Sequence, residues 1–307
     1  MSDRTLYYGG QAVIEGVMIR GPRSVAVACR RPDGDITVRR EGLGAVYTGT
    51  LRRIPFVRGV IVLGETLTLG MRSLVFSSNV ALGEEEKEIS PVAVIGMGLT
   101  ALALVAVLFF LGPVLAVGWL EDRIGSSVVV VVIEGVIRLA MLLAYLGLIA
   151  LVPDIRRVYA YHGAEHKSIH ALEAGDPLEP STVQRHPTAH VRCGTSFLLT
   201  VVVVSVVVFA ALGSPDLWLR VVSRVALIPV IAALAYELIR LGGRFYDNRV
   251  ARVLMWPNLA LQALTTRQPD DAQVEVALRA LREVMAAEGV AAAEVAEEAT
   301  AAQPSEG

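Results

Sequence analysis

Long runs without charged residues set the strongest limit on what this chain can fold into. About twenty apolar residues in a helix cross the hydrocarbon core of a bilayer. Four blocks approach or exceed that length: residues 91–120, 126–152, 195–213 and 218–241. The first and third carry no charge, the second carries only Glu134 and Arg138, and the charges of the fourth must lie near its ends or face protein. These blocks predict four transmembrane helices.

Lys and Arg are unevenly distributed between these blocks, and the bias predicts the orientation. Nine Arg precede Pro55 and five Lys or Arg lie in residues 153–194, whereas residues 213–217 contain none. Because positively charged segments stay on the cytoplasmic side, we expect a multi-pass protein of the cell membrane with both termini and residues 153–194 in the cytoplasm. The lipid bilayer is then its partner, and no nucleic acid is expected. Cys29 and Cys193 would face a reducing compartment without forming a disulfide.

The segments outside the blocks predict small cytosolic elements. Residues 24–40 alternate in polarity around a Pro-Asp-Gly turn, a pattern typical of a β-hairpin. Within residues 55–78, Arg58, Glu65 and Arg72 recur every seven positions, which predicts an amphipathic helix that lies in the membrane interface or packs against the spans. A fifth span is the alternative for this segment, and it would place the N-terminal arginines outside.

The predicted fold is therefore mainly α. It is an integral membrane helical bundle with four transmembrane helices, an amphipathic interfacial helix and a small N-terminal cytosolic β-hairpin element. A C-terminal helix behind an Asp N-cap signal should dock through one apolar face, formed by Val274, Leu278, Leu281 and Met285. The regions in chain order are a β-rich region (1–54), the interfacial helix (55–78), the bundle with its cytosolic loop (90–241), a cytosolic C-terminal region (242–289) and a disordered tail (290–307).

All five histidines of the chain lie within residues 162–190, in the segment YHGAEHKSIHALEAG and shortly after it. HGAEH fits the H-x-x-E-H pattern of inverted zincins. On a helix His162 and His166 share a face and can bind one metal ion together. Glu165 lies beside them, where it could take a proton from a bound water as general base. The alternative is a helix and loop whose histidines cap helices and bond lipid headgroups.

The remaining metal ligands must come from another segment, because a straight helix separates its own donors. His170 would lie about 12 Å and Glu173 about 16 Å along the axis from His162. The segment RHPTAHVRCGTSF supplies two further donors that suit zinc. The sequence thus predicts a zinc site with the candidate ligands His162, His166, His190 and Cys193, in which His190 or Cys193 completes the site that the helical pair begins.

Several motifs together give the chain a family resemblance. YGGQAVIEGVMIRGP, YHGAEHKSIHALEAG, HVRCGTSF, YELIRLGG and LTTRQPDDAQVEVALRAL resemble the YqhQ-like family of bacterial membrane proteins, over nearly the whole chain. That family is a domain of unknown function labelled as a predicted metal-dependent enzyme, and the resemblance implies the same here. Val191 replaces a proline of the family motif, whereas the candidate donors His190 and Cys193 remain. His170 and His186 match no position of that motif.

The sequence favours a membrane-embedded, zinc-dependent hydrolase of unknown substrate, with its site at the cytoplasmic face. A closed four-ligand site would instead be structural, so a non-enzymatic scaffold or regulator is the alternative. A transporter is a second alternative, and it would depend on Glu134 and Arg138. We expect those two residues to be a paired charge that fixes helix register. Cys193 as a nucleophile with His190 as its base is a minor option, since nothing completes the triad.

Overall fold

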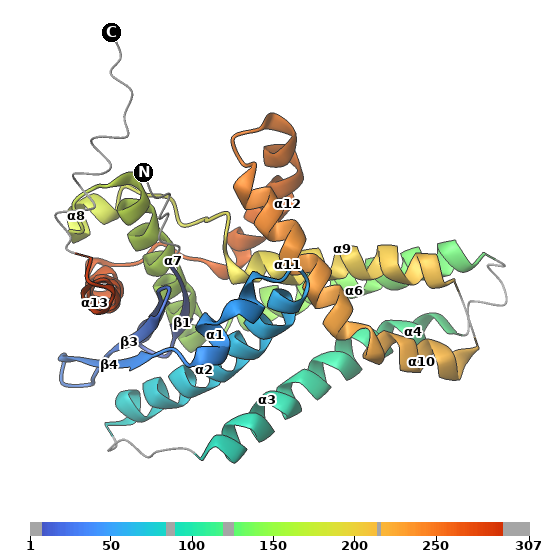
Figure 1. Ribbon diagram of the computed structural model, residues 1–307, viewed down its shortest axis with the longest axis horizontal. Coiled ribbons are helices and arrows are strands. Elements are labelled where there is room, and N and C mark those ends of the chain that lie inside the picture. The colour runs from blue at the N-terminus through green and yellow to red at the C-terminus, as the bar shows by residue number, and fades with distance from the viewer. Residues whose placement is uncertain (1–7, 84–89, 119–125, 214–215, 291–307) are drawn as a thin grey trace, which may run out of the picture.

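A four-stranded antiparallel meander forms the N-terminal part of the molecule (Figure 1). The strands are β1 (Gly9–Val13), β2 (Gly16–Arg20), β3 (Ser24–Arg30) and β4 (Ile36–Gly42). The predicted hairpin is confirmed as β3–β4, and Gly34 in its turn has a φ of 97°, which residues with a side chain rarely adopt. The sequence indicated the β1–β2 hairpin only as a short strand among tight turns. The computed structural model describes residues 8–83, 90–118, 126–213 and 216–290, so the predicted tail lies almost wholly outside it.

Helices make up most of the remaining described chain. They are, in chain order, α1 (Ala45–Thr48), the 3-10 helix η1 (Thr50–Arg53), α2 (Val57–Leu82), α3 (Pro91–Val105), the π-helical η2 (Ala106–Leu111), α4 (Gly112–Gly118), α6 (Ser127–Ile149), α7 (Pro153–Ala174), α8 (Pro180–Val183), α9 (Gly194–Leu212), α10 (Leu217–Ala226), α11 (Ile228–Arg244), α12 (Arg249–Thr265) and α13 (Asp271–Glu288). Figure 1 shows the sheet, α7 and α13 at one end of the molecule and α6, α9 and α10 extending toward the other. The predicted class, mainly α with a small N-terminal sheet, is confirmed.

The apolar helices support a multi-pass membrane protein. In the described chain four segments are long and apolar enough to span a bilayer: Val57–Leu82, Val92–Gly118, Val128–Ile149 and Gly194–Leu212. Two details differ from expectation. Residues 218–241 are not one straight helix, because α10 and α11 meet at 45°, just before Pro229, which lacks the N–H that a continuous helix needs. The segment expected at the interface forms α2, which itself has the length and composition of a span.

The polar stripe of α2 faces protein on two sides. Glu65 is 3% exposed and pairs with Arg20 of β2 at 3.0 Å and with Arg52 at 2.9 Å. On the other side, Arg58 pairs with Glu237 of α11. Removing the partners of Glu65 would be costly, because its buried carboxylate would be left uncompensated. The stripe therefore fixes α2 between the sheet and α11. Of the two arrangements expected for this helix, packing against the spans agrees with these contacts.

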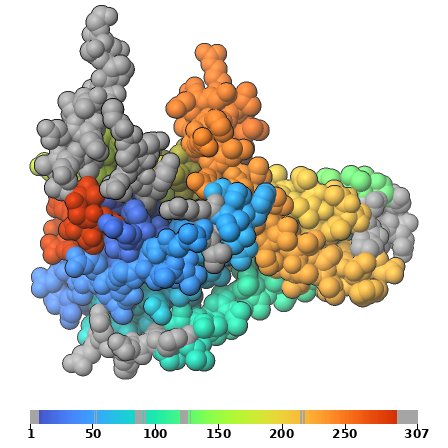
Figure 2. Space-filling view, in the orientation of Figure 1, coloured from blue at the N-terminus to red at the C-terminus, as the bar shows by residue number. Residues whose placement is uncertain are grey.

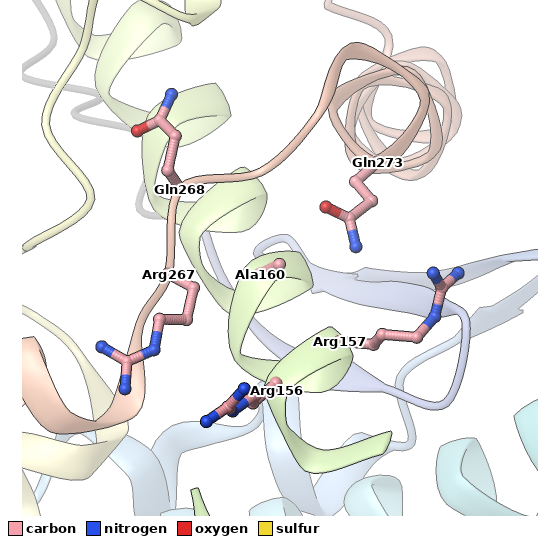
Figure 3. A pocket seen from close by; sticks show the side chains of 6 residues that line it. All are labelled: Arg156, Arg157, Ala160, Arg267, Gln268 and Gln273. Carbon is pink, nitrogen blue, oxygen red and sulfur yellow. The ribbon is translucent and has the colours of Figure 1, made fainter. Parts of the chain in front are cut away.

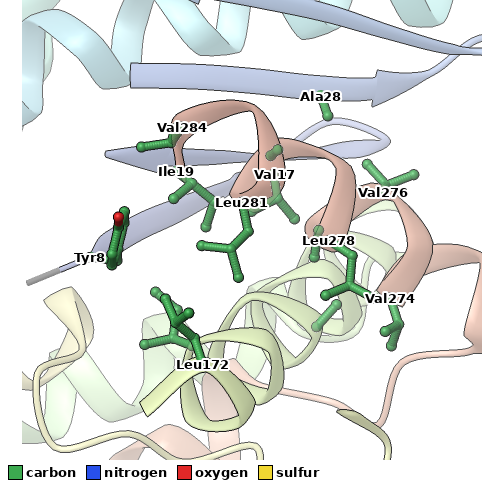
Figure 4. Close-up of a cluster of buried hydrophobic side chains, with 14 of the residues drawn as sticks. Tyr8, Val17, Ile19, Ala28, Leu172, Val274, Val276, Leu278, Leu281 and Val284 are labelled. Atoms are coloured by element: carbon green, nitrogen blue, oxygen red, sulfur yellow. The ribbon is translucent and has the colours of Figure 1, made fainter. Parts of the chain in front are cut away.

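The C-terminal helix α13 forms the core of the part that contains the sheet and α7. It begins with a capping box, in which the Asp270 side chain accepts from the N–H of Gln273 and the Gln273 side chain accepts from the N–H of Asp270. The predicted docking face is at most 2% exposed at every position: Val274, Leu278, Leu281 and Met285. Figure 4 shows α13 between the strands and α7, with Ile19 on one side and Leu172 on the other. α13 thus fixes α7 against the sheet.

The buried charges of the membrane helices pair differently from expectation. Glu134 of α6 accepts a hydrogen bond from Arg224 of α10 at 2.9 Å. Arg138 donates instead to the carbonyl oxygen of Phe109 at 2.6 Å. Pro113, four positions further on, has no N–H to donate to that carbonyl. The predicted Glu134–Arg138 pair is therefore wrong, and the two side chains link α6 to different neighbours.

The turn between α11 and α12 projects from the body of the molecule as a separate lobe (Figure 2). Its large apolar side chains are more than half exposed: Phe245, Val250, Val253, Leu254 and Trp256. Exposed aliphatic side chains beside tryptophan are typical of a segment at a bilayer interface. The lobe precedes residues 258–268, which contact the candidate site.

Candidate metal centre

The candidate site is built on α7, which begins four residues after α6 ends. At Gly163, inside the HGAEH motif, a Cβ atom would lie 2.1 Å from the carbonyl oxygen of Arg267. Only glycine lets the segment after α12 pass this close. The N–H of Arg267 also donates to the carbonyl oxygen of Tyr159 at 2.9 Å. This contact brings the end of α12 onto the histidine motif.

His162 and His166 present defined nitrogen atoms to the site. Nδ1 of His162 lies 2.8 Å from the carbonyl oxygen of Thr265, and Nδ1 of His166 lies 2.6 Å from that of Thr188. A carbonyl oxygen only accepts, so each Nδ1 carries the hydrogen and each Nε2 keeps a free lone pair. Backbone carbonyls orient metal-binding histidines in the same way. Burial lowers the pKa of His166, which favours the neutral ring.

Cys193 faces the two histidines from the start of α9. Its Sγ lies 3.3 Å from Nε2 of His162. The donor atoms of His162, His166 and Cys193 all lie within 4.8 Å of one another. As the N-cap residue of α9, Cys193 accepts a hydrogen bond from the N–H of Thr195 at 3.4 Å. The positive end of the helix dipole at this position suits an anionic sulfur.

Glu165 is buried on the side of α7 that faces the sheet. The N–H of Gly10 in β1 donates to its carboxylate, and in the described part of the chain Oε2 has no hydrogen-bond partner. Burial raises the pKa of Glu165, although the neighbouring His162 acts in the opposite direction. A Cβ atom on Gly10 would lie 2.9 Å from Cδ of Glu165, so this glycine leaves room for the carboxylate. The N-terminal motif is therefore part of the site.

His190 belongs to a different group of donors. The side chain of Gln262 in α12 accepts from the N–H of His190 at 2.8 Å and donates to its carbonyl at 2.9 Å. This fixes the backbone so that Nε2 of His190 lies 3.2 Å from Oε2 of Glu173. His170, Glu173 and His190 form a second set of donor atoms within 4.8 Å of one another. The structure thus brings three of the four predicted ligands together and places His190 in the second set.

The residues that position the donors were not identified from the sequence. Gly163 lies inside the motif, and its role could have been inferred only by knowing what packs on α7. Thr265 and Gln262 act on His162 and His190 from α12, more than seventy positions away, without any local pattern. His186 pairs outside both sets, with Asp176 at 3.0 Å, whereas His170, which also matches no position of the family motif, lies in the second set.

Comparison with known proteins identifies a family. A family described as a protein of unknown function (DUF1385) matches residues 54–287. This chain belongs to the DUF1385 family. It is also 35% identical over 303 residues to the uncharacterized protein YqhQ of Bacillus subtilis (strain 168), and the match covers 92% of this chain and 93% of that protein. The YqhQ-like resemblance is confirmed, and no solved structure matches the chain.

In this DUF1385 protein the first donor set has the chemistry of a zinc site. Imidazole nitrogen and thiolate sulfur are ligands that zinc prefers. Among the residues that the structure describes, no fourth His, Cys, Asp or Glu atom joins the set of His162, His166 and Cys193. These three residues would hold a zinc ion and would leave one ligand position for water, as in catalytic rather than structural zinc sites.

An arginine-lined cavity lies where α7, the segment after α12 and the start of α13 meet. Its volume is about 450 Å³, and the residues around it (Figure 3) are Arg156, Arg157, Ala160, Arg267, Gln268 and Gln273. Arg267 lies two residues after Thr265, so one short segment contacts both the cavity and His162. Arg157 is already bound to Glu15 at 2.6 Å. Clustered guanidinium groups attract anionic ligands, so this DUF1385 cavity suits a negatively charged group.

Proposed function

We propose that this membrane protein is a zinc-dependent hydrolase whose active site lies at the cytoplasmic face of the cell membrane. One observation carries the proposal. His162 and His166, each with its Nδ1 hydrogen bonded to a backbone carbonyl, direct their remaining lone pairs to the group that also contains Sγ of Cys193. Bound zinc would act as a Lewis acid and would lower the pKa of a coordinated water molecule to about 7.

Glu165 is the proposed general base. It stands between the two histidines in the H-x-x-E-H order, and it is only 4% exposed. Gly10 orients the carboxylate through its N–H, while Oε2 is without a partner in the described chain and can accept a proton. Burial raises the pKa of Glu165, which favours a carboxylate that accepts a proton.

The position of the donors along the spans supports the proposed cytoplasmic location. α7 follows the C-terminal end of α6, and Cys193 caps the N-terminal end of α9. The two ends belong to the segment that the Lys and Arg distribution assigns to the cytoplasm. A site there would meet water-soluble substrates and the headgroups of the inner leaflet. The segment 265–267 contacts His162 and also lines the arginine-rich cavity, which favours substrates that carry negative charge.

A scaffold or regulator with a structural metal is the second candidate. The donors join α7 to the start of α9, and the contacts with Thr265 and Gln262 add α12. A metal ion would therefore fasten three helices together, which favours a structural role. A transporter has less support, because Glu134 and Arg138 each bind a neighbouring helix. The absence of a fourth ligand within the described residues favours the hydrolase.

Hydrolysis assays with the purified full-length protein in nanodiscs test the proposal. Ester, amide and phosphoester substrates, each in neutral and anionic form, should reveal an activity that a chelator removes and zinc restores. Glu165→Gln should keep the zinc and lose about 10²–10⁴-fold in rate. Glu179→Gln, an exposed glutamate of the same loop, is the matched control and should retain the rate. Turnover that Glu165→Gln leaves unchanged would reject the role of this carboxylate.

A further inference from the structure

A second set of metal-type donors lies further along α7, and the proposed zinc site does not use it. His170 and Glu173 come from α7 and His190 from the loop before α9, with their donor atoms within 4.8 Å of one another. His170 and Glu173 are three residues apart, so they share one face of the helix. The rings of His166 and His190 have centroids 5.8 Å apart, so the two sets are neighbours.

The two imidazoles of this set are close together, and one has a defined lone pair. Nε2 of His170 lies 2.9 Å from the carbonyl oxygen of Ala189, so Nε2 carries the hydrogen and Nδ1 keeps its lone pair. The rings of His170 and His190 have centroids 4.6 Å apart. His190 is 4% exposed, so its ring is shielded from competition by bulk water.

Glu173 is already oriented toward His190. Its Oε2 lies 3.2 Å from Nε2 of His190, and its Oε1 pairs with Arg192. The N–H of Arg192 also donates to Nδ1 of His190 at 3.2 Å, so in this arrangement the hydrogen of His190 is on Nε2. A metal ion has to displace that hydrogen, whereas His162 and His166 already present free Nε2 atoms. The second set should therefore bind metal more weakly than the first.

We propose that His170, Glu173 and His190 bind a second divalent transition-metal ion. The inference rests on the proposed function and extends it to a centre with two ions. Two imidazoles and one carboxylate suit zinc, manganese or iron, which accept nitrogen and oxygen ligands. In hydrolases with paired metals, the second ion stabilises oxygen atoms that the first alone does not reach. The same residues without an ion would be a hydrogen-bonded His–Glu–Arg network, and metal binding separates the two cases.

Metal stoichiometry of the full-length, untagged protein tests the proposal. After dialysis against zinc, mass spectrometry should find about two ions per chain, a number taken from the two donor sets. His170→Ala or Glu173→Gln should leave about one, and Cys193→Ala should also leave about one, each from a different set. His186→Ala, a histidine outside both sets, should keep both. Circular dichroism and gel filtration establish that each variant is folded.

Cobalt titration of the unaltered protein gives a second measurement that needs no variant. The first equivalent should produce a thiolate-to-cobalt absorption band, and the second should bind without increasing it, because only the first set contains sulfur. Saturation after one equivalent, with a stoichiometry that His170→Ala does not change, would overturn the second site and leave the zinc site standing. Protein that binds no metal at all would overturn both.

Discussion

His162 donates its Nδ1 hydrogen to the carbonyl oxygen of Thr265 across 2.8 Å, although 103 positions separate the two residues. Gly163 permits this contact, because any side chain at this position would collide with the carbonyl oxygen of Arg267. The lone pair that His162 offers to a metal therefore depends on how closely the end of α12 packs on α7. In many metalloproteins, a hydrogen bond from the histidine nitrogen that does not bind the metal tunes the metal affinity.

Gly163→Ala should push the segment after α12 away from α7. We expect zinc affinity to fall by about 10–100-fold and the free energy of unfolding to fall by roughly 1–3 kcal/mol. Competition with a chromophoric chelator and chemical denaturation measure the two effects. Gly147→Ala in α6 is the control, since nothing lies within 4 Å of the added Cβ atom. Unchanged zinc affinity in Gly163→Ala would contradict this role for the glycine.

When two buried charged residues of the bundle are exchanged, the folded yield should depend on whether the two residues are partners in the structure. Exchanging Glu134 with Arg224 keeps an opposite-charge pair between α6 and α10, so much of the folded yield should survive. Exchanging Glu134 with Arg138 keeps the same net charge but removes the donor to the Phe109 carbonyl and places like charges near Arg224. That exchange should abolish folding. Equal yields of the two exchanged proteins in detergent gel filtration would show that the pairing is not structural.

The residues of the site that follow from short-range patterns could be predicted from the sequence. His162, Glu165 and His166 follow from the spacing of one helix, because neighbours four positions apart share a face. Cys193 followed from its residue type and from the return of the chain to the same membrane side. The Asp270 capping signal and the apolar face of α13 were equally local, and the structure confirms them.

Contacts between segments far apart in the chain could not be predicted from the sequence. Gln262 fixes His190 and turns it toward Glu173, and no local pattern marks a glutamine for that role. Glu134 pairs with Arg224 of α10, whereas Arg138 donates to the carbonyl of Phe109 and to the hydroxyl of Ser205. Each outcome depends on packing partners that lie tens of residues away.

Acid should destabilise the metal-free protein. Burial lowers the pKa of His166 and lowers that of His170 from 6.5 to about 4. Below pH 6.5 the unfolded chain binds protons at these rings that the folded chain does not, so stability is complete above pH 6.5 and declines as the pH falls toward 4. Urea denaturation of chelator-treated protein between about pH 7 and pH 5 measures the slope. His170→Asn should reduce it, and a slope that His170→Asn does not alter would argue against the buried neutral ring.

The orientation in the membrane can be tested with reporter fusions. Fusions at Gly125 and Gly213 should report the outside, and a fusion after Gly175 should report the cytoplasm, because Lys and Arg are concentrated in residues 153–194. A fusion at the N-terminus should also report the cytoplasm if α2 packs at the interface. An outside N-terminus would instead make α2 a full span.

Zinc-edge X-ray absorption spectroscopy on the protein with one equivalent of zinc tests the central claim most directly. We predict one sulfur neighbour at about 2.3 Å and nitrogen or oxygen neighbours at about 2.0–2.1 Å. Cys193→Ala should remove the sulfur neighbour, and His162→Ala should weaken zinc binding strongly. Cys29→Ala should change nothing, since Cys29 is buried in the sheet. A spectrum without sulfur, or a sulfur neighbour that persists in Cys193→Ala, would contradict a zinc site formed by His162, His166 and Cys193.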